Sequence, residues 1–242
     1  MFSRYKFEGI KFVIFKIIID IINFNSFKLT LLTDTQELKK FHKLEFKSNV
    51  VLMPIPHTFS KQKDTKKELL INKIKIFFPG KFRVDKFSKN FKYFINRNNF
   101  KNIHIFVNKD FNLKIKNKFQ ISKIKGNISR NKYFQYFRSS NLIILPYENK
   151  NYEYRSSGIF VESISIGKIV FVSSKTWMSS QLRKFKLNEL IVKDWQKFDL
   201  LKFIKTSDIN LINKKLKKMQ NVYLKIHNEK NFIVTFQKIL NK

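Results

Sequence analysis

The sequence predicts an α/β protein built on a doubly wound parallel sheet. Short runs that are apolar at every position recur along the 242 residues, and stretches with helical periodicity separate these runs. A strand that is apolar throughout suits a sheet covered by helices on both faces, because a sheet with one wet face would alternate apolar and polar residues. Strands that alternate with helices are typical of βαβ units, whose strands pair in parallel.

Prolines, glycines and polar clusters set the limits of the expected elements. Strands are expected at 28–33, 50–56, 74–80, 102–108, 119–124, 141–147, 169–173 and 188–192. Helices are expected at 6–23, 35–42, 86–97, 129–140, 158–166, 179–185 and over most of 197–240. Ser129 is the expected N-cap of its helix, because a serine hydroxyl can accept a hydrogen bond from an amide of the first turn.

The formal net charge of +33 is the most extreme property of the chain. Such a charge suggests a nucleic acid or an anionic membrane as a partner. The chain also lacks alanine and is rich in Phe, Ile, Lys and Asn, the residues that AT-rich coding sequences favour. Its lysines are spread along the full length, whereas a nucleic-acid binder gathers them with aromatic residues on one stripe. We attribute most of the charge to composition and keep a nucleic-acid-binding protein as the weaker alternative.

Residues that are missing or scattered exclude further classes of protein. The chain has no cysteine, which rules out disulfides and thiolate metal sites, and its 4 histidines show no metal-ligand spacing. We therefore expect neither a metal nor a cofactor.

The apolar N-terminal stretch is interrupted by Lys11, Lys16 and Asp20, so no uncharged span long enough for a membrane exists there. A buried or half-buried helix is expected and an interfacial helix is the alternative, in a cytoplasmic protein that is either free or peripheral at the inner face of the membrane.

Two glycine-containing turns combine residues that can bind phosphate. Gly80 ends a predicted strand, and Arg83 and Lys86 follow at a spacing that lets both point at one anion. Residues 156–158 open a predicted helix, whose first amides and dipole attract anions. Glu162 lies one turn into that helix, where a carboxylate suits sugar hydroxyls better than a phosphate. Ligands of doubly wound sheets bind at the carboxyl ends of the strands, where both turns are expected. Solvated basic residues and an ordinary serine N-cap are the alternatives.

The loop 145–154 is the third candidate, because it carries several tyrosines beside acidic residues. Tyr147 and Tyr154 could stack on a ligand or donate hydrogen bonds to it. Tyrosines at the edge of a loop are also common as packing residues, which is the alternative here.

Three stretches together resemble the group 1 GT-B glycosyltransferases (glycosyltransferase family 4-like). Residues 140–177 are similar to the donor-binding segment of that family, with a strand ending in Pro-Tyr, a polar loop, Ser-Gly, and a helix that carries Phe and Glu. The stretch FFPGKFRVDKF (77–87) resembles the Gly-x-x-Arg-x-x-Lys-Gly phosphate loop of the same family. The stretches LLTDTQELKKF (31–41) and VVLMPIPH (50–57) resemble the end of its N-terminal domain. The likeness keeps the family's order over about residues 28–192.

The resemblance implies roles for individual residues in binding a nucleotide-sugar. Gly80, Arg83 and Lys86 would hold the donor diphosphate. The turn at Ser157 and Gly158 would offer its amides to the phosphate. Glu162 matches the second glutamate of a paired motif that holds the ribose. The expected donor-binding residues are Gly80, Arg83, Lys86, Tyr147, Tyr154, Arg155, Ser156, Ser157, Gly158 and Glu162. The family's first glutamate is replaced by Tyr154, and Phe87 and Ile169 replace a glycine and a proline. The contacts with the donor sugar are therefore expected to differ, and no catalytic residue can be assigned.

The same resemblance implies a Rossmann-like GT-B C-terminal domain with a truncated N-terminal domain. Residues 1–56 are expected to be the remnant of the acceptor-side domain, 57–70 the linker, and 71–205 the donor nucleotide-sugar-binding domain. Residues 206–242 are expected to form C-terminal helices that pack back toward the N-terminal part.

The activity implied by the resemblance is transfer of a sugar from a UDP- or GDP-linked donor to an acceptor such as a glycan or a lipid-linked glycan. No metal is needed in such chemistry, because basic residues and helix amides stabilise the leaving diphosphate. An inactive GT-B-like domain that binds a partner is the alternative. A shortened N-terminal domain would leave apolar surface uncovered, so we expect association with a second copy or with a companion chain.

Overall fold

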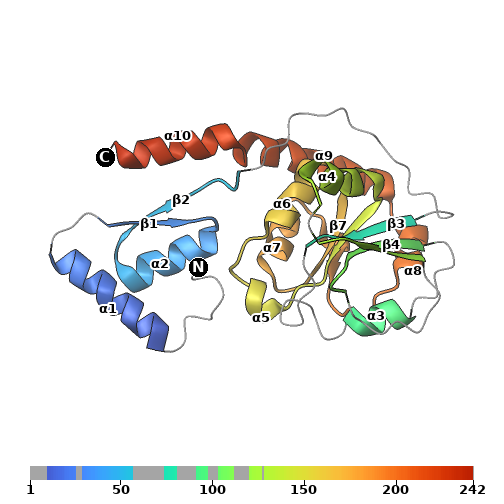
Figure 1. The fold of residues 1–242 in the computed structure, drawn as a ribbon, viewed down its shortest axis with the longest axis horizontal. Helices are drawn as coiled ribbons and strands as arrows, with labels where there is room; N and C mark the ends of the chain where they lie inside the picture. Colours follow the sequence, from blue (N-terminus) through green and yellow to red (C-terminus); the bar gives the residue numbers. More distant parts are fainter. Residues whose placement is uncertain are drawn as a thin grey trace.

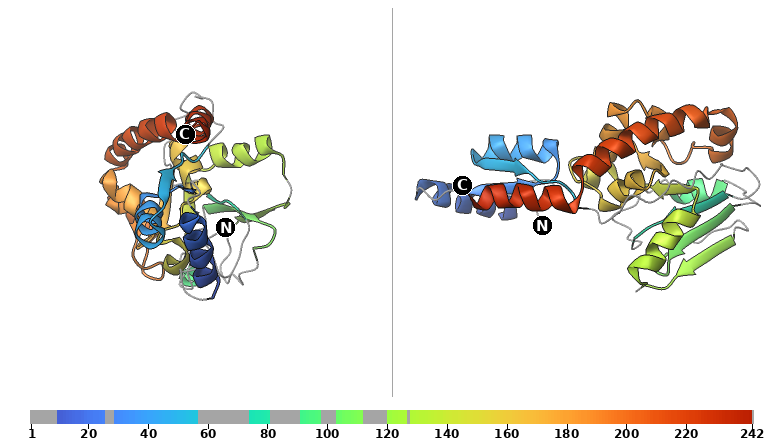
Figure 2. Two further views of the ribbon diagram at one scale, coloured as in Figure 1. Left: turned by 90° about the vertical axis from the view of Figure 1, so that its left-hand side faces the viewer. Right: turned by 90° about the horizontal axis from the view of Figure 1, so that it is seen from above.

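The computed structural model consists of two parallel sheets with their flanking helices (Figure 1). The residues that it describes are 10–25, 29–56, 74–80, 91–97, 103–111, 120–126 and 128–241. Figure 2 shows the same two parts from the end and from above, with the smaller sheet at one end of an elongated molecule.

The smaller part contains one βαβ unit preceded by a helix. Its elements are α1 (Ile10–Phe24), β1 (Thr30–Thr33), α2 (Gln36–Phe46) and β2 (Asn49–Leu52). β1 and β2 pair in parallel, with Thr30 opposite Asn49. The side chain of Thr35 caps α2 by accepting a hydrogen bond from the amide of Leu38 at 3.1 Å. This cap fixes the turn between β1 and α2, which faces the larger part of the molecule.

The larger sheet has six parallel strands in the order β5-β4-β3-β6-β7-β8. The strands are β3 (Ile74–Phe78), β4 (Ile103–Asn108), β5 (Gln120–Ile124), β6 (Leu142–Leu145), β7 (Ile169–Ser173) and β8 (Ile191–Val192). From β3 the chain adds β4 and β5 on one side of β3. It then returns and adds β6, β7 and β8 on the other side of β3. This reversal between β3 and β6 is where doubly wound sheets form a crevice for ligands. The predicted fold class is confirmed.

The helices of the larger part agree with the sequence predictions except at two places. The helices are α3 (Phe91–Arg97), α4 (Arg130–Ser139), α5 (Asn149–Tyr152), α6 (Gly158–Ser165), α7 (Trp177–Lys184), α8 (Leu200–Thr206), α9 (Ile209–Ile226) and α10 (Glu229–Leu240). Ser129 caps α4 as expected, accepting from the amide of Lys132 at 3.4 Å. The expected strand 188–192 was wrong in its first half, because Asn188–Leu190 form a 3₁₀ turn. The short helix α5 lies in the tyrosine loop, where no helix was predicted.

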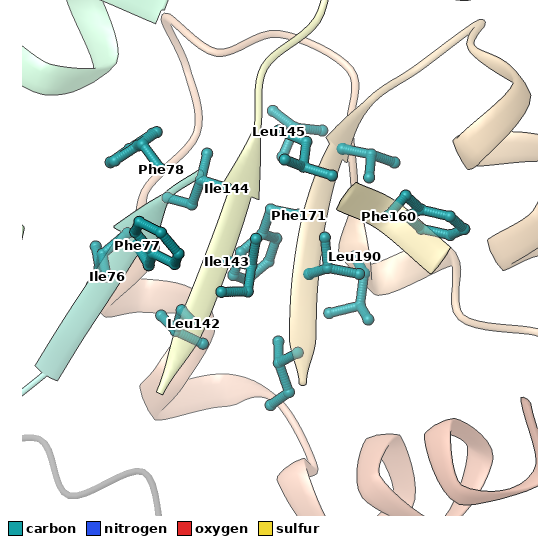
Figure 3. Close-up of a cluster of buried hydrophobic side chains, with 14 of the residues drawn as sticks. Ile76, Phe77, Phe78, Leu142, Ile143, Ile144, Leu145, Phe160, Phe171 and Leu190 are labelled. Atoms are coloured by element: carbon teal, nitrogen blue, oxygen red, sulfur yellow. The ribbon is translucent and has the colours of Figure 1, made fainter. Parts of the chain in front are cut away.

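The core lies around the central strands β6 and β7. All four side chains of β6 are at most 1% exposed, and those of β7 are also buried. Figure 3 shows side chains of β3, β6 and β7 gathered with Phe160 of α6 and with Leu190. Each large apolar side chain buried in this way contributes about 1.5–3 kcal/mol to folding. The continuous apolar runs that predicted these strands are therefore explained by burial on both faces.

The C-terminal helices connect the larger part with the smaller one. α9 packs on α6, where Gln220 Nε2 donates to the carbonyl of Ser165 at 3.0 Å. α10 continues alongside the smaller part (Figures 1 and 2) and buries none of its side chains. The expected linker 57–70 lies outside the described residues, and the expected domain boundaries stay predictions.

The helix α1 contacts α2 along one side and leaves most of its described apolar side chains exposed, so the choice between a half-buried and an interfacial helix stays open. Ile19 is buried, and the ring of Phe15 lies 5.3 Å from that of Phe46 in α2. The opposite face exposes Val13, Ile14, Ile17, Ile18, Ile21 and Phe24. In the described part of the chain, no helix has the length and apolar character needed to cross a membrane. The expected association with a partner stays a prediction.

Candidate functional site

The first predicted phosphate turn begins at Gly80, directly after β3. Gly80 has φ 93°, a left-handed value that a residue with a Cβ rarely adopts. The structure therefore explains why a glycine stands at this position. Arg83 and Lys86 lie outside the described residues, and their role stays a prediction.

The second predicted turn opens α6. Ser157 is the N-cap, and its hydroxyl accepts a hydrogen bond from the amide of Phe160 at 3.3 Å. Gly158 is the first helical residue and is exposed, and a Cβ built there would meet no atom within 4 Å. The start of α6 is therefore open to a ligand above Gly158, next to the amides that carry the positive end of the helix dipole.

Tyr147 supports this turn from inside the core. Its side chain is only 1% exposed, and its ring lies 4.3 Å from that of Tyr152. Burial raises the pKa of Tyr147 and the nearby Tyr152 adds to the rise, whereas the positive charge of Arg155 opposes it. The guanidinium of Arg155 lies 5.3 Å from the centre of the Tyr152 ring. Tyr147 is thus packed against Tyr152 in the core, while Arg155 is half-buried at the loop.

Glu162 is oriented by a residue that sequence reasoning missed. Its Oε2 atom accepts a hydrogen bond from the hydroxyl of Tyr133, on α4, at 2.9 Å. Burial raises the pKa of Glu162, and the hydrogen bond from Tyr133 and the positive charge of Arg130 oppose that rise. Tyr133 is one of 8 tyrosines and belongs to no motif, so the sequence contains no signal that would select it.

The remaining two predicted residues contact the smaller part of the molecule. The hydroxyl of Ser156 donates a hydrogen bond to the carboxylate of Asp34. The hydroxyl of Thr35 donates to the backbone carbonyl of Tyr154 at 2.9 Å. The side chain of Tyr154 is 46% exposed. The turn between β1 and α2 is therefore bonded to the loop that leads into α6.

Comparison with known proteins was informative only at the level of structure. No protein-family model and no curated protein matches the sequence. Among solved structures, the sucrose-phosphate synthase from Thermosynechococcus elongatus matches with a TM-score of 0.61 at 12% identity, covering 88% of this chain and 57% of that one. A glycosyltransferase from Rickettsia africae ESF-5 matches with a TM-score of 0.60 at 13% identity, covering 94% of this chain and 65% of that one. TarM matches with a TM-score of 0.61 at 13% identity, covering 99% of this chain and 49% of that one.

The chain has a GT-B glycosyltransferase-like fold. The resemblance that the motifs suggested is thereby confirmed for the fold. The chain spans 49% to 65% of the length of these three GT-B structures. At identities of 12% to 13% the match shows the fold alone, so the roles of individual residues stay predictions. Within the described ranges, no three His, Asp or Glu side chains are grouped closely enough to hold a metal ion.

His227 lies where the C-terminal helices meet the chain after β2, between the two parts of the protein. Its Nδ1 atom accepts a hydrogen bond from the amide of Ile55, just after β2, at 3.1 Å. Its ring is 4.9 Å from that of Tyr223 in α9. Burial lowers the pKa of His227 to about 4, and the nearby carboxylate of Asp34 opposes this effect. At neutral pH the imidazole is therefore neutral and able to accept.

Acidification is expected to lower the free energy of unfolding of the protein, because His227 is buried in its neutral form. The pKa of about 4 in the folded state lies below the ordinary value of 6.5, so the unfolded state binds the proton first as the pH falls. The contribution of neutral His227 to the stability of the folded state is complete above pH 6.5 and is lost as the pH falls toward 4. Urea unfolding at neutral and at mildly acidic pH measures this drop in stability. The drop between the two pH values should be smaller for His227→Gln than for the wild type. Equal losses in the two proteins would contradict the prediction.

Proposed function

We propose that the chain binds a UDP- or GDP-linked sugar and is the donor-binding part of a glycosyltransferase. One observation carries the proposal. The turn at Gly80 follows β3, the open N-terminus of α6 follows β6, and these two strands are parallel neighbours where the strand order reverses. Two turns suited to phosphate therefore lie at one edge of the sheet, where ligands of such sheets bind.

In this proposal the donor's diphosphate lies between the two turns. Amides at the start of α6 hydrogen-bond the phosphate oxygens, and Arg83 and Lys86, which follow β3 in the sequence, are the proposed basic partners of the diphosphate. The carboxylate of Glu162 accepts hydrogen bonds from ribose hydroxyls, and Tyr133 holds that carboxylate in place. Tyr133 is thus a positioning residue for nucleotide binding.

The proposed reaction follows from stabilising the leaving diphosphate. The bond between the anomeric carbon and the diphosphate oxygen breaks, and its electron pair leaves with the diphosphate. The acceptor's hydroxyl oxygen forms the new bond to the anomeric carbon and releases its proton. Positive groups and helix amides lower the barrier because negative charge develops on the diphosphate in the transition state. The acceptor-side group that takes the proton is unassigned.

An inactive GT-B-like domain that binds a partner is the second candidate. The family's first glutamate is Tyr154 here, and its side chain is exposed while its backbone carbonyl accepts a hydrogen bond from Thr35. Without that glutamate the site lacks one carboxylate of the family motif, so its contacts with the donor sugar differ from those of the family. Nucleotide binding distinguishes this candidate from the first when it is measured together with the substitutions below.

Nucleotide binding by calorimetry tests the proposed function. UDP or GDP should bind the wild type, and Arg83→Ala and Glu162→Gln should each weaken binding about tenfold or more, because each removes a charged hydrogen-bonding partner. Matched controls are Arg183→Ala, on α7, and Glu229→Gln, on α10, which change the same charges at exposed positions.

A short oligonucleotide measured in parallel tests the role of the net charge. Binding that depends on counterion release should collapse as salt is added. If only the oligonucleotide binds and neither nucleotide does, the donor-binding proposal is wrong. If a nucleotide binds equally to all variants, its site lies elsewhere on the chain.

A further inference from the structure

A carboxylate from the smaller part lies at the proposed phosphate turn. Asp34 directly follows β1, and its side chain accepts a hydrogen bond from Ser156, two residues before the first residue of α6. Asp34 and Ser156 are 122 residues apart in the chain, so the contact exists only through the arrangement of the two parts. The proposed donor site therefore includes a residue from outside the larger sheet.

The turn that carries Asp34 is held firmly in this position. The neighbouring Thr35 caps α2 by accepting from the amide of Leu38, and the same hydroxyl donates to the carbonyl of Tyr154. Thr35 is only 1% exposed. The two adjacent residues Asp34 and Thr35 thus make two hydrogen bonds to the loop 154–156, and the turn between β1 and α2 cannot move away from this loop without breaking both.

The position of Asp34 has an electrostatic consequence for an incoming phosphate. An aspartate side chain carries a negative charge at neutral pH, and the positive end of the α6 dipole attracts that charge. His227 is close enough for Asp34 to raise its pKa, but burial keeps that imidazole neutral at neutral pH. His227 therefore does not offset the charge of the carboxylate.

We infer that Asp34 belongs to the donor site and lowers its affinity for a nucleoside diphosphate, because its carboxylate and the diphosphate compete for the start of α6. This inference rests on the proposed function. When the diphosphate binds, repulsion weakens the bond between Asp34 and Ser156. Donor binding is thereby coupled to release of the turn between β1 and α2 from the larger part. A free anion such as inorganic phosphate makes fewer contacts than a nucleoside diphosphate. Its binding energy would not offset the repulsion by Asp34, so the site would bind it less well.

Calorimetry with UDP and GDP on Asp34→Asn tests the inference. Asparagine keeps the size of the side chain and an oxygen that can accept from Ser156, so the substitution removes mainly the charge. We expect the variant to bind about tenfold more tightly than the wild type at low salt. The gain should shrink as salt is added, because exposed charges are screened.

Two further variants separate charge from packing. Asp20→Asn makes the same charge change at an exposed position on α1 and should bind like the wild type. Thr35→Val removes both the bond to Tyr154 and the cap of α2 but keeps the carboxylate of Asp34, so it should raise the affinity for the nucleotide less than Asp34→Asn does. Thermal unfolding of each variant shows whether its fold is retained.

The outcomes distinguish this inference from the proposed function. Tighter nucleotide binding by Asp34→Asn than by the wild type and Asp20→Asn supports the competition. If the wild type binds and Asp34→Asn binds no more tightly than Asp20→Asn, the inference is wrong while the donor site stands. If neither the wild type nor Asp34→Asn binds a nucleotide, both are wrong.

Discussion

Replacing Phe171 by alanine is expected to destabilise the protein by about 3–5 kcal/mol. Phe171 lies in the middle of β7 and has no exposed surface. Its ring contacts those of Phe198 and Phe203, with centroids 5.0 Å and 4.9 Å away. Alanine would remove these contacts and leave a cavity that the surrounding strands cannot close, since β7 is paired on both sides. Urea unfolding followed by circular dichroism measures the change.

The matched control is Phe24→Ala, at the end of α1. Phe24 is 88% exposed, so its removal should change the free energy of unfolding by about 0.5 kcal/mol or less. Domains of this size are stable by only about 5–15 kcal/mol, so the two phenylalanine variants should differ clearly in their unfolding midpoints. A loss below about 1 kcal/mol for Phe171→Ala would show that the packing around β7 is looser than described.

The elements of the fold were predictable where the signal is local. β6 and β7 were recognised because they are apolar at every position, which reflects burial on both faces. The strand order could not be derived in the same way, because pairing partners such as β3 and β6 are separated by a long stretch of chain. The 3₁₀ turn Asn188–Leu190 was predicted as strand because three residues are too few to show a period.

The site was predictable only within single elements. Ser157, Gly158 and Glu162 share one helix and its cap, so their spacing alone placed them together. Tyr133 reaches Glu162 from 29 residues away, and Asp34 reaches Ser156 from 122 residues away. Contacts between distant elements depend on the tertiary arrangement, which no pattern along a single sequence encodes. The contacts of Tyr133 and Asp34 were therefore missed, although the start of α6 was placed correctly at Ser157 and Gly158.

Lys168 is expected to stabilise the protein, although the sequence interpretation attributed lysines in general to composition. Its side chain is only 8% exposed, and its ammonium donates to the carbonyls of Arg138 at 2.9 Å and Ser140 at 2.7 Å. These carbonyls lie at the C-terminus of α4, where a positive charge also meets the negative end of the helix dipole. Lys168→Ala would leave two carbonyls without this donor, at an expected cost of about 2–4 kcal/mol in the free energy of unfolding.

Two companion variants show which property of Lys168 matters. Lys168→Met keeps the apolar stem but not the ammonium, so it should recover only the packing part of the loss. Lys205→Ala, at an exposed position in the last turn of α8, should change the stability by about 0.5 kcal/mol or less. If Lys168→Met is as stable as the wild type in urea unfolding, the two hydrogen bonds contribute nothing and Lys168 is a packing residue. If the free energy of unfolding of Lys168→Met is close to that of Lys168→Ala, the ammonium stabilises the C-terminus of α4. This end of α4 precedes β6, the strand that leads to the proposed donor turn.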